Sequence, residues 1–284
     1  MGKIRMHDMD IKNTEEDMIN INEVNVSLYM SGNISEKFSS LARQLPDMQV
    51  RYLNGLQYID CGKRSDTFNT VFGTPTLQED ITRITQYYSQ RNMPAAWWFA
   101  EPTTVIAELL EQAGWCHEEN DVGMYFPLTA PISACPKKVL SCIEYCDSPV
   151  RFRDFGEVLS AIFEPGNPVE AENIRAIYQA AGEHCTRLDE HLIQLVGYLD
   201  GVPVSTATLY LKDNVAGIFD IATPEKWRRK GFGSEMFHSA LQLAQKKQAK
   251  ICVLQASPDG LNIYKKYGFK ISGKFEVWNL STTA

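Results

Sequence analysis

The sequence predicts an α/β fold made of two domains of the same type. A chain of 284 residues is long enough for about two domains of ~150 residues each. Both halves repeat one order of patterns: strand, long helix, strand, short helix, a glycine–aromatic pair and a final strand. The spacing agrees, because Phe68 lies 47 positions before Trp115 and Phe219 lies 50 before Phe269. We infer a duplicated domain, with residues 1–130 and 131–284 as the two units.

Charge is divided unequally between these units. Residues 1–130 carry 10 Lys and Arg against 18 Asp and Glu, whereas residues 131–284 carry 18 against 17. An acidic first unit argues against a nucleic-acid partner. No apolar run approaches the ~20 residues of a membrane span, and the polar first residues lack a signal-peptide core, so we expect a cytoplasmic protein without a membrane partner. The seven cysteines form no C-x-x-C pair, which indicates free thiols and no metal site.

In the first unit, scattered apolar positions predict loosely defined helices over residues 14–45. Thr76, with Glu79 three residues later, has the pattern of a capping box at the start of a helix. The other expected elements are strands at 56–61, 68–72, 95–100 and 124–128, and a helix at 102–113. Prolines and a lack of periodicity predict a linker over residues 129–138.

In the second unit, Asp200-Gly201 between two apolar runs is a strong hairpin signal. Apolar residues at i, i+3, i+4 and i+7 predict a helix over residues 234–247. Its buried face consists of Phe237, Ala240, Leu241 and Ala244. The other expected elements are helices at 149–163 and 168–181, a short helix capped by residues 257–259, and strands at 139–145, 191–199, 204–211, 215–222, 250–255 and 275–280.

The most informative stretch is the turn at residues 227–234, W-R-R-K-G-F-G-S, between the strand at 215–222 and the helix after it. Gly231 and Gly233 let backbone approach a ligand, and the first turn of a helix offers free N–H groups at the positive end of its dipole. Such a turn can bind phosphate. These residues alone leave an ordinary basic turn before a helix as the alternative.

Two segments of the second unit together resemble the GNAT superfamily of N-acetyltransferases. Residues 228–233 are similar to its Q/R-x-x-G-x-G/A signature, and residues 257–269 to its N-x-x-A-x-x-x-Y-x-x-x-G-F segment, with Ser257 for the Asn and Gly260 for the Ala. The resemblance covers about residues 139–280. It implies domains in which a mixed, mostly antiparallel sheet is flanked by helices.

Residues 50–128 resemble a degenerate copy, as in tandem members of this superfamily. The position of the phosphate-binding turn holds residues 73–76, G-T-P-T, without basic residues or a second glycine. We therefore expect residues 1–130 to be non-catalytic and residues 131–284 to be the catalytic domain.

The resemblance implies acetyl-CoA as co-substrate and no metal. Backbone N–H groups of the turn, its basic side chains and the Ser234 hydroxyl would hold the pyrophosphate, while residues 220–222 would pair with the pantetheine. Tyr264, with a reference pKa of ~10, is expected to act as general acid for a thiolate of pKa ~8.5; simple packing is its alternative role. The expected coenzyme-binding residues are Ile221, Ala222, Thr223, Arg228, Arg229, Lys230, Gly231, Phe232, Gly233, Ser234 and Ser257.

A general base is also required, because an amine acceptor must lose a proton before it attacks. Asp220 is the one acid on the strand at 215–222, so it is the first candidate, with substrate binding as its alternative role. The face that it occupies depends on whether the strand bulges. Glu164 is a second candidate, although acids in turns are usually just solvated.

We therefore expect an acetyl-CoA-dependent N-acetyltransferase that modifies a primary amine of a small molecule or peptide. The alternative is a sensor or regulatory protein that binds acyl-CoA without transferring the acyl group. The motifs do not specify the acceptor, the acyl chain or the oligomeric state.

Overall fold

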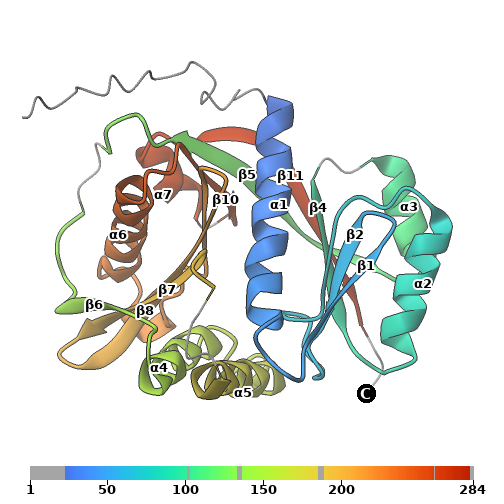
Figure 1. The fold of residues 1–284 in the computed structure, drawn as a ribbon, viewed down its shortest axis with the longest axis horizontal. Helices are drawn as coiled ribbons and strands as arrows, with labels where there is room; N and C mark the ends of the chain where they lie inside the picture. The colour runs from blue at the N-terminus through green and yellow to red at the C-terminus, as the bar shows by residue number, and fades with distance from the viewer. Residues whose placement is uncertain (1–22, 101–102, 133–135, 185–188, 259, 282–284) are drawn as a thin grey trace, which may run out of the picture.

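The computed structural model describes residues 23–100, 103–132, 136–184, 189–258 and 260–281. Its strands form one eleven-stranded sheet in the order β1-β2-β3-β4-β11-β5-β10-β9-β8-β7-β6, with helices on both faces (Figure 1). Neighbouring strands are antiparallel except for two parallel pairs, β3 with β4 and β9 with β10. The predicted fold class, helices flanking a mixed and mostly antiparallel sheet, is confirmed.

The two halves share one order of elements in their later parts, as the spacing predicts, and the second half begins with an additional strand and helix. The first half forms α1 (Glu23–Ala42), β1 (Gln49–Leu53), β2 (Leu56–Asp60), β3 (Thr70–Phe72), α2 (Gln78–Ser89), β4 (Ala95–Ala100), α3 (Thr104–Gln112) and β5 (Cys116–Pro127). The second forms β6 (Cys142–Tyr145), α4 (Pro149–Ser160), α5 (Pro168–His184), β7 (Leu192–Leu199), β8 (Val202–Lys212), β9 (Val215–Phe219), the 3-10 turn η2 (Glu225–Trp227), α6 (Phe232–Lys246), β10 (Ile251–Ala256), α7 (Leu261–Lys266) and β11 (Lys270–Leu280). The order β3-α2-β4-α3-β5 thus matches β9-α6-β10-α7-β11, and the central strand pair is parallel in both.

The last strand of each repeat is exchanged between the halves. β11 lies between β4 and β5 of the first half, and its pairs with β4 run from Phe275↔Ala100 to Leu280↔Ala95. β5 in turn pairs with β10 of the second half along the whole length of β10. The sheet is therefore continuous across the boundary expected near residue 130.

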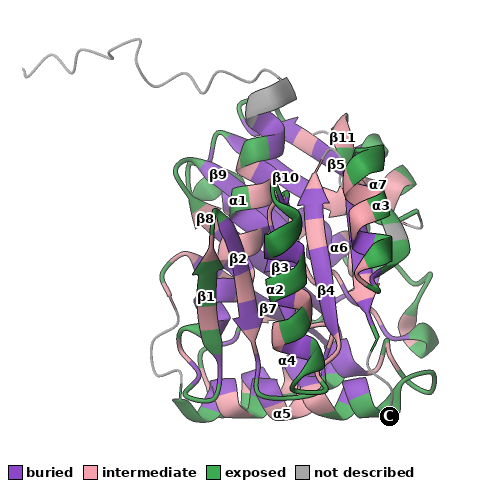
Figure 2. Ribbon diagram, turned by 90° about the vertical axis from the view of Figure 1, so that its right-hand side faces the viewer, coloured by how far each residue is buried: buried purple, intermediate pink, exposed green. Residues whose placement is uncertain are grey.

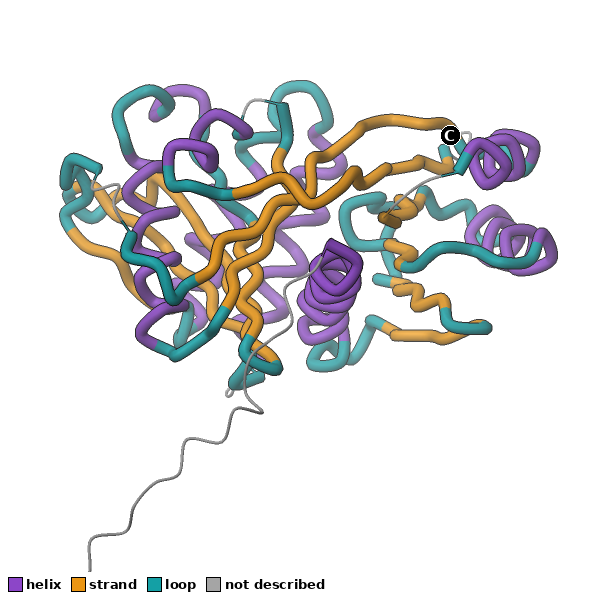
Figure 3. The backbone as a smooth tube through the Cα atoms, turned by 90° about the horizontal axis from the view of Figure 1, so that it is seen from above, coloured by secondary structure: helices purple, strands orange, loops and turns teal. Residues whose placement is uncertain are grey.

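Helix α1 stands between the two halves and contacts both (Figures 1 and 3). Asn33 donates from Nδ2 to the Tyr210 carbonyl of β8 at 3.3 Å, and Gln57 of β2 donates to the Ser35 carbonyl at 3.0 Å. A Cβ on Gly217 of β9 would overlap Asn33 Oδ1, so the absence of a side chain there lets the helix approach the strand.

Different helices cover the two faces of the second half. Ile34 of α1 packs in one core with Phe155 of α4 and Tyr178 of α5, whereas Phe237 of α6 packs in another with Leu254 of β10. In the first half, α2 covers the buried strand β4 and turns its polar side outward (Figure 2). Of the described helices, none is long and apolar enough to cross a bilayer.

The structure corrects three local predictions. Thr76 does not cap α2, which begins at Gln78 after Leu77 without a side-chain cap. The short helix α7 begins after Gly260 without a side-chain cap, so Ser257 does not cap it as predicted; the Ser257 carbonyl instead accepts from the amides of Gly260 and Leu261, and Asp259 of the predicted cap at 257–259 lies outside the described residues. The strand predicted at 215–222 ends at Phe219. Residues 1–22, which include the start of the loosely defined helical stretch, lie outside the described residues.

The strand exchange predicts that the two halves are unstable when separated. A fragment of residues 131–284 would keep β11 but lose both of its neighbours, and β10 would lose β5. Exposed edges of this kind pair with other chains. We expect the fragment to aggregate when expressed alone and to be recovered in a complex when co-expressed with residues 1–130, as measured by size-exclusion chromatography. A folded, monomeric fragment would contradict this expectation.

Candidate active site

The parallel strands β9 and β10 diverge at the centre of the second half. Their ladder runs from Val215↔Ile251 to Gly217↔Val253 and ends there. Both strands nevertheless continue, β9 along β8 and β10 along β5. Within the described residues, no strand lies between them beyond this point. Beyond Gly217 and Val253, the facing edges of β9 and β10 are therefore not paired with each other.

Asp220 forms a bulge where β9 ends. Its φ of 51° interrupts the alternation of the strand, so Phe219 and Asp220 both face α1, with the Lys37 ammonium 5.8 Å from the Phe219 ring centroid and 2.9 Å from Asp220 Oδ1. β8 holds the segment after the bulge. Thr206 Oγ1 donates to the Asp220 carbonyl at 2.8 Å, and the Thr206 amide donates to the Ala222 carbonyl at 3.0 Å.

The turn before α6 has the backbone form of an anion-binding turn. Arg229 and Gly231 both have positive φ, 60° and 95°, and Gly231 is the N-cap of α6. A Cβ on Gly233 would lie 3.1 Å from Thr223 Oγ1, so the first turn of the helix lies close to the segment after β9. Its first N–H groups are directed at the site by the helix geometry.

Basic side chains surround this turn and are exposed. Arg228 donates from Nε to the Thr223 carbonyl at 3.1 Å, and Lys230 donates to the Lys226 carbonyl at 3.0 Å while its ammonium lies 4.8 Å from the Trp227 ring centroid. These contacts are with neutral groups, and an anion would form stronger, charge-assisted hydrogen bonds with the same cations.

Tyr264 lies on the α6 side of the divergence. Its ring centroid is 4.9 Å from that of Phe237, and a Cβ on Gly260 would be 2.9 Å from its Cε2. Burial raises the pKa of Tyr264 to about 12, with smaller contributions from Asp121 and Cys252. The phenol therefore stays protonated at neutral pH. Since this pKa lies above the ~8.5 of a thiol, the hydroxyl is better suited to donate a hydrogen bond to a thiolate than to lose its proton completely.

The segment of residues 257–269 contacts the turn before α6. Tyr267 donates from its hydroxyl to the Ser234 carbonyl at 3.4 Å, which connects the end of α7 to the start of α6. Ser257 is exposed just after β10. The structure thus groups Tyr264 and the residues of the turn around α6, with Ser257 at the exposed end of β10.

Asp220 lies on the opposite face, in an ion pair with Lys37 of α1. The Lys37 Nζ and Asp220 Oδ1 are 2.9 Å apart, and the two side chains are only 8% and 15% exposed. Asp220 Oδ2 is buried without a hydrogen-bond partner. Tyr264 and Asp220 therefore approach the divergence of the strands from opposite sides. Glu164 is placed differently, because its carboxylate is 45% exposed and paired with Arg175 on the surface.

Two residues of this region, Lys37 and Glu235, are not predicted from the sequence. Lys37 comes from the other half of the chain, and its one local signal is a charge on a helical face that is otherwise buried. Glu235 in the first turn of α6 is buried, and its Oε2 accepts from the amides of Val139 and Leu140 at 2.6 and 2.8 Å. It anchors the segment that enters the second half beside the turn.

The equivalent place in the first half is closed. The β3–β4 ladder extends to Phe72↔Trp98, and the Gly73 amide continues it by donating to the Trp98 carbonyl at 3.2 Å. The first turn of α2 carries Glu79 and Asp80, whose negative charges repel an anion. This half has neither diverging strands nor a basic turn at that position.

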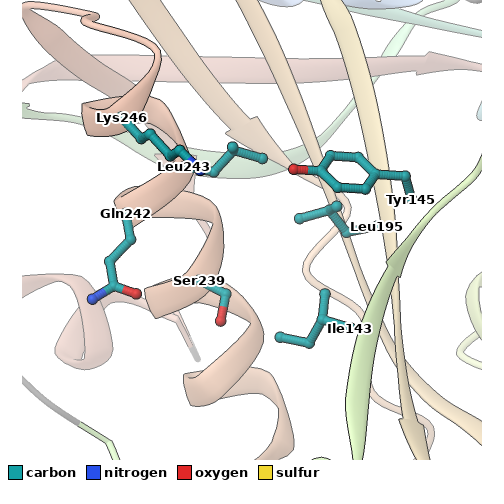
Figure 4. A pocket seen from close by; sticks show the side chains of 7 residues that line it. All are labelled: Ile143, Tyr145, Leu195, Ser239, Gln242, Leu243 and Lys246. Carbon is teal, nitrogen blue, oxygen red and sulfur yellow. The ribbon is translucent and has the colours of Figure 1, made fainter.

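A separate cavity of about 250 Å³ lies between α6 and strands β6 and β7 (Figure 4). It is lined by Ile143, Tyr145, Leu195, Ser239, Gln242, Leu243 and Lys246. None of these is among the residues expected to bind coenzyme A. No group of three or more His, Cys, Asp or Glu side chains suited to a metal ion occurs among the described residues.

Comparison with known proteins finds one family match, in the second half. Residues 155–269 match the acetyltransferase (GNAT) family, so this part of the chain is a GNAT domain. No curated protein matches the chain. The match includes α6, the turn before it, and Tyr264.

Solved structures share the fold of most of the chain. A GCN5-related N-acetyltransferase from Kribbella flavida superposes with a TM-score of 0.62 at 13% identity, covering 89% of this chain and 96% of that one. A tandem GNAT protein from the clavulanic acid biosynthesis pathway superposes with a TM-score of 0.54 at 9% identity, covering 88% and 94%. A conserved protein of unknown function from Staphylococcus epidermidis gives 0.57 at 16% identity, covering 78% and 87%.

The contacts of Glu235 predict a loss of stability when its carboxylate is removed. Glu235→Ala leaves the buried Leu140 amide and the partly buried Val139 amide without an acceptor, and an unsatisfied buried donor costs about 1–3 kcal/mol. We expect a lower urea midpoint for Glu235→Ala and a smaller decrease for Glu235→Gln, which keeps an acceptor oxygen. Equal midpoints for Glu235→Ala and the native chain would show that these hydrogen bonds do not stabilise the fold.

Proposed function

We propose that this protein transfers an acetyl group from acetyl-CoA to a primary amine of a small molecule or peptide. The observation that carries the proposal is the divergence of β9 and β10 next to the basic turn at the start of α6. The diverging backbone suits an extended pantetheine arm, and the turn suits a pyrophosphate. The GNAT match of residues 155–269 supports acyl transfer at this place.

The residues around the divergence suit two adjacent parts of the coenzyme, the pyrophosphate and the pantetheine arm. The turn and its flanking residues, Arg228, Arg229, Lys230, Gly231, Phe232, Gly233 and Ser234, would hold the pyrophosphate. Ile221, Ala222 and Thr223 would pair with the pantetheine. Ser257, just after β10, would contact the coenzyme from the other strand. Gly233 is decisive for the fit, because a side chain there would fill the space beside Thr223.

Two side chains would handle protons on opposite faces of the strands. Tyr264 would donate a hydrogen bond to the departing sulfur, for which its raised pKa of about 12 keeps it protonated. Asp220 would accept the proton of the acceptor amine. Because α1 covers the face that Asp220 occupies, the acceptor would approach beside α1 and the coenzyme beside α6.

The first half, residues 1–130, would not bind acyl-CoA. The closed β3–β4 ladder and the acidic first turn of α2 support this view. Its contributions to residues 131–284 would be structural, through β5, and substrate-shaping, through α1.

A second candidate function is acyl-CoA binding without transfer. The Lys37–Asp220 ion pair favours it, because the carboxylate proposed as base already holds a cation and is largely buried. Catalysis by Asp220 requires that its bonding with Lys37 be exchanged for bonding with an acceptor.

Calorimetry and a thiol-release assay distinguish these functions. We expect acetyl-CoA to bind and free thiol to appear with at least one amine of a panel of alkyl amines, amino acids and lysine peptides. Gly233→Val is expected to weaken acetyl-CoA binding by at least about tenfold, roughly 1.4 kcal/mol, while Gly32→Ala on the open side of α1 leaves binding unchanged. Tight binding without thiol release from any amine supports the sensor, and lack of binding refutes both functions.

Removal of the Tyr264 hydroxyl tests its proposed role. Tyr264→Phe keeps the ring packed on Phe237 but removes the hydrogen bond to sulfur, so we expect kcat to fall by about 10²–10³ with little change in acetyl-CoA affinity. Steady-state kinetics measure kcat, and calorimetry measures the affinity for acetyl-CoA. If affinity and kcat both stay at the native values, Tyr264 is a packing residue only.

A further inference from the structure

We propose that Lys37 is itself an acyl acceptor, so that the chain acetylates its own helix α1. The inference rests on the proposed function, since it needs acetyl-CoA bound at the diverging strands. Lys37 would then be a modification site in the first half of the chain, which is proposed to be non-catalytic.

Lys37 has an environment unlike that of any other basic residue in the described part of the chain. It is the one lysine or arginine there that is buried. Its ammonium is 2.9 Å from Asp220 Oδ1 and 3.9 Å from the centroid of the Phe38 ring. A carboxylate and an aromatic face are the groups that bind an alkylammonium ion. Lys37 thus occupies a site built for a primary amine.

The position of this amine is that required of an acceptor. Asp220 directly precedes Ile221 and Ala222, the residues proposed to pair with the pantetheine, so Lys37 lies at the end of the strand where the thioester would be held. The amine enters from the α1 face, opposite to α6 and Tyr264. Nucleophile and leaving group would therefore lie on opposite sides of the strands.

The packing leaves little room for a competing amine in this conformation. Asp220 Oδ2 is buried and has no hydrogen-bond partner, so no solvent-borne amine reaches it without movement of α1. Asn33, one turn before Lys37, fills the space above Gly217. Of the groups in place, the Lys37 amine is the one already in contact with the proposed base.

The reaction balances with residues already named. The Lys37 ammonium gives one proton to the Asp220 carboxylate, and the neutral amine attacks the thioester carbonyl. The C–N bond forms, the C–S bond breaks, and the bonding electron pair leaves with sulfur, stabilised by the Tyr264 hydroxyl. The sulfur takes up one proton, the new amide loses one, and Asp220 returns its proton to solvent, so acetyl-lysine, coenzyme A and one net proton are produced.

The test is mass spectrometry of the full-length chain after incubation with isotope-labelled acetyl-CoA. Acetylation blocks tryptic cleavage at Lys37 and so joins residues 13–43 in one labelled peptide. Uncatalysed acetylation prefers exposed amines such as Lys63 and Lys212, which serve as internal controls. We expect Lys37 to be labelled faster than these residues in the folded chain and to lose this preference in urea.

Two variants separate the reaction from the ion pair. Lys37→Arg keeps a cation beside Asp220 and should yield no peptide labelled at position 37. Asp220→Asn should lower the labelling rate of Lys37 by about 100-fold or more, as expected on loss of a general base, while labelling of Lys63 is unchanged. Circular dichroism verifies that both variants fold, and equal labelling of Lys37 in the native and Asp220→Asn chains would overturn the proposal.

The outcomes also distinguish this inference from the proposed function. If acetyl-CoA binds and external amines release thiol while Lys37 stays unlabelled, the pair with Asp220 is purely structural and the inference is wrong, but the proposed function stands. If acetyl-CoA does not bind at all, the proposed function is wrong and the inference fails with it.

Discussion

The exchange of β5 and β11 is the constraint on which the rest of the structure depends. Without it, each half would be a separate sheet with an open edge, whereas with it every strand of the described sheet except the edge strands β1 and β6 has two neighbours. The candidate site depends on the exchange as well, because β10 takes its outer neighbour from the first half and Asp121 of β5 contributes to the raised pKa of Tyr264. The first half thus supplies the strand that borders β10 at the candidate site.

Helix α1 completes this arrangement with polar contacts along one face. Asn33, Lys37 and Ser40, at i, i+4 and i+7, bond to Tyr210, Asp220 and Asp189 of the second half. Burying two charges costs desolvation energy, which the attraction between them offsets only when their geometry is good. Removing one partner of a buried pair typically costs about 3–5 kcal/mol. Such a pair is a weak argument for stability alone. The pair lies beside the diverging strands, where the proposed reaction would use both of its members.

The two halves differ in structure at the position of the candidate site. β3 stays paired with β4 to the end of β3. Trp97 donates to the Gly73 carbonyl at 2.9 Å, at the position that corresponds to the separation of β9 and β10 in the second half. The helices after these strands also differ in charge. The first turn of α2 carries Glu79 and Asp80, whereas that of α6 carries Glu235 alone and follows a turn with three basic residues, Arg228, Arg229 and Lys230.

The sequence by itself determined the features that depend on neighbouring residues: the buried face of α6, the Asp200-Gly201 hairpin with φ of 49° and 82°, and the glycine turn. It also determined the duplicated order of elements, because hydrophobic periodicity and the spacing of motifs can be read from neighbouring residues. Only the tertiary structure decided the strand exchange, the face that Asp220 occupies and its pairing with Lys37, 183 positions away. Pairing between distant segments leaves no local pattern, since it depends on which edges and faces meet once the sheet has formed.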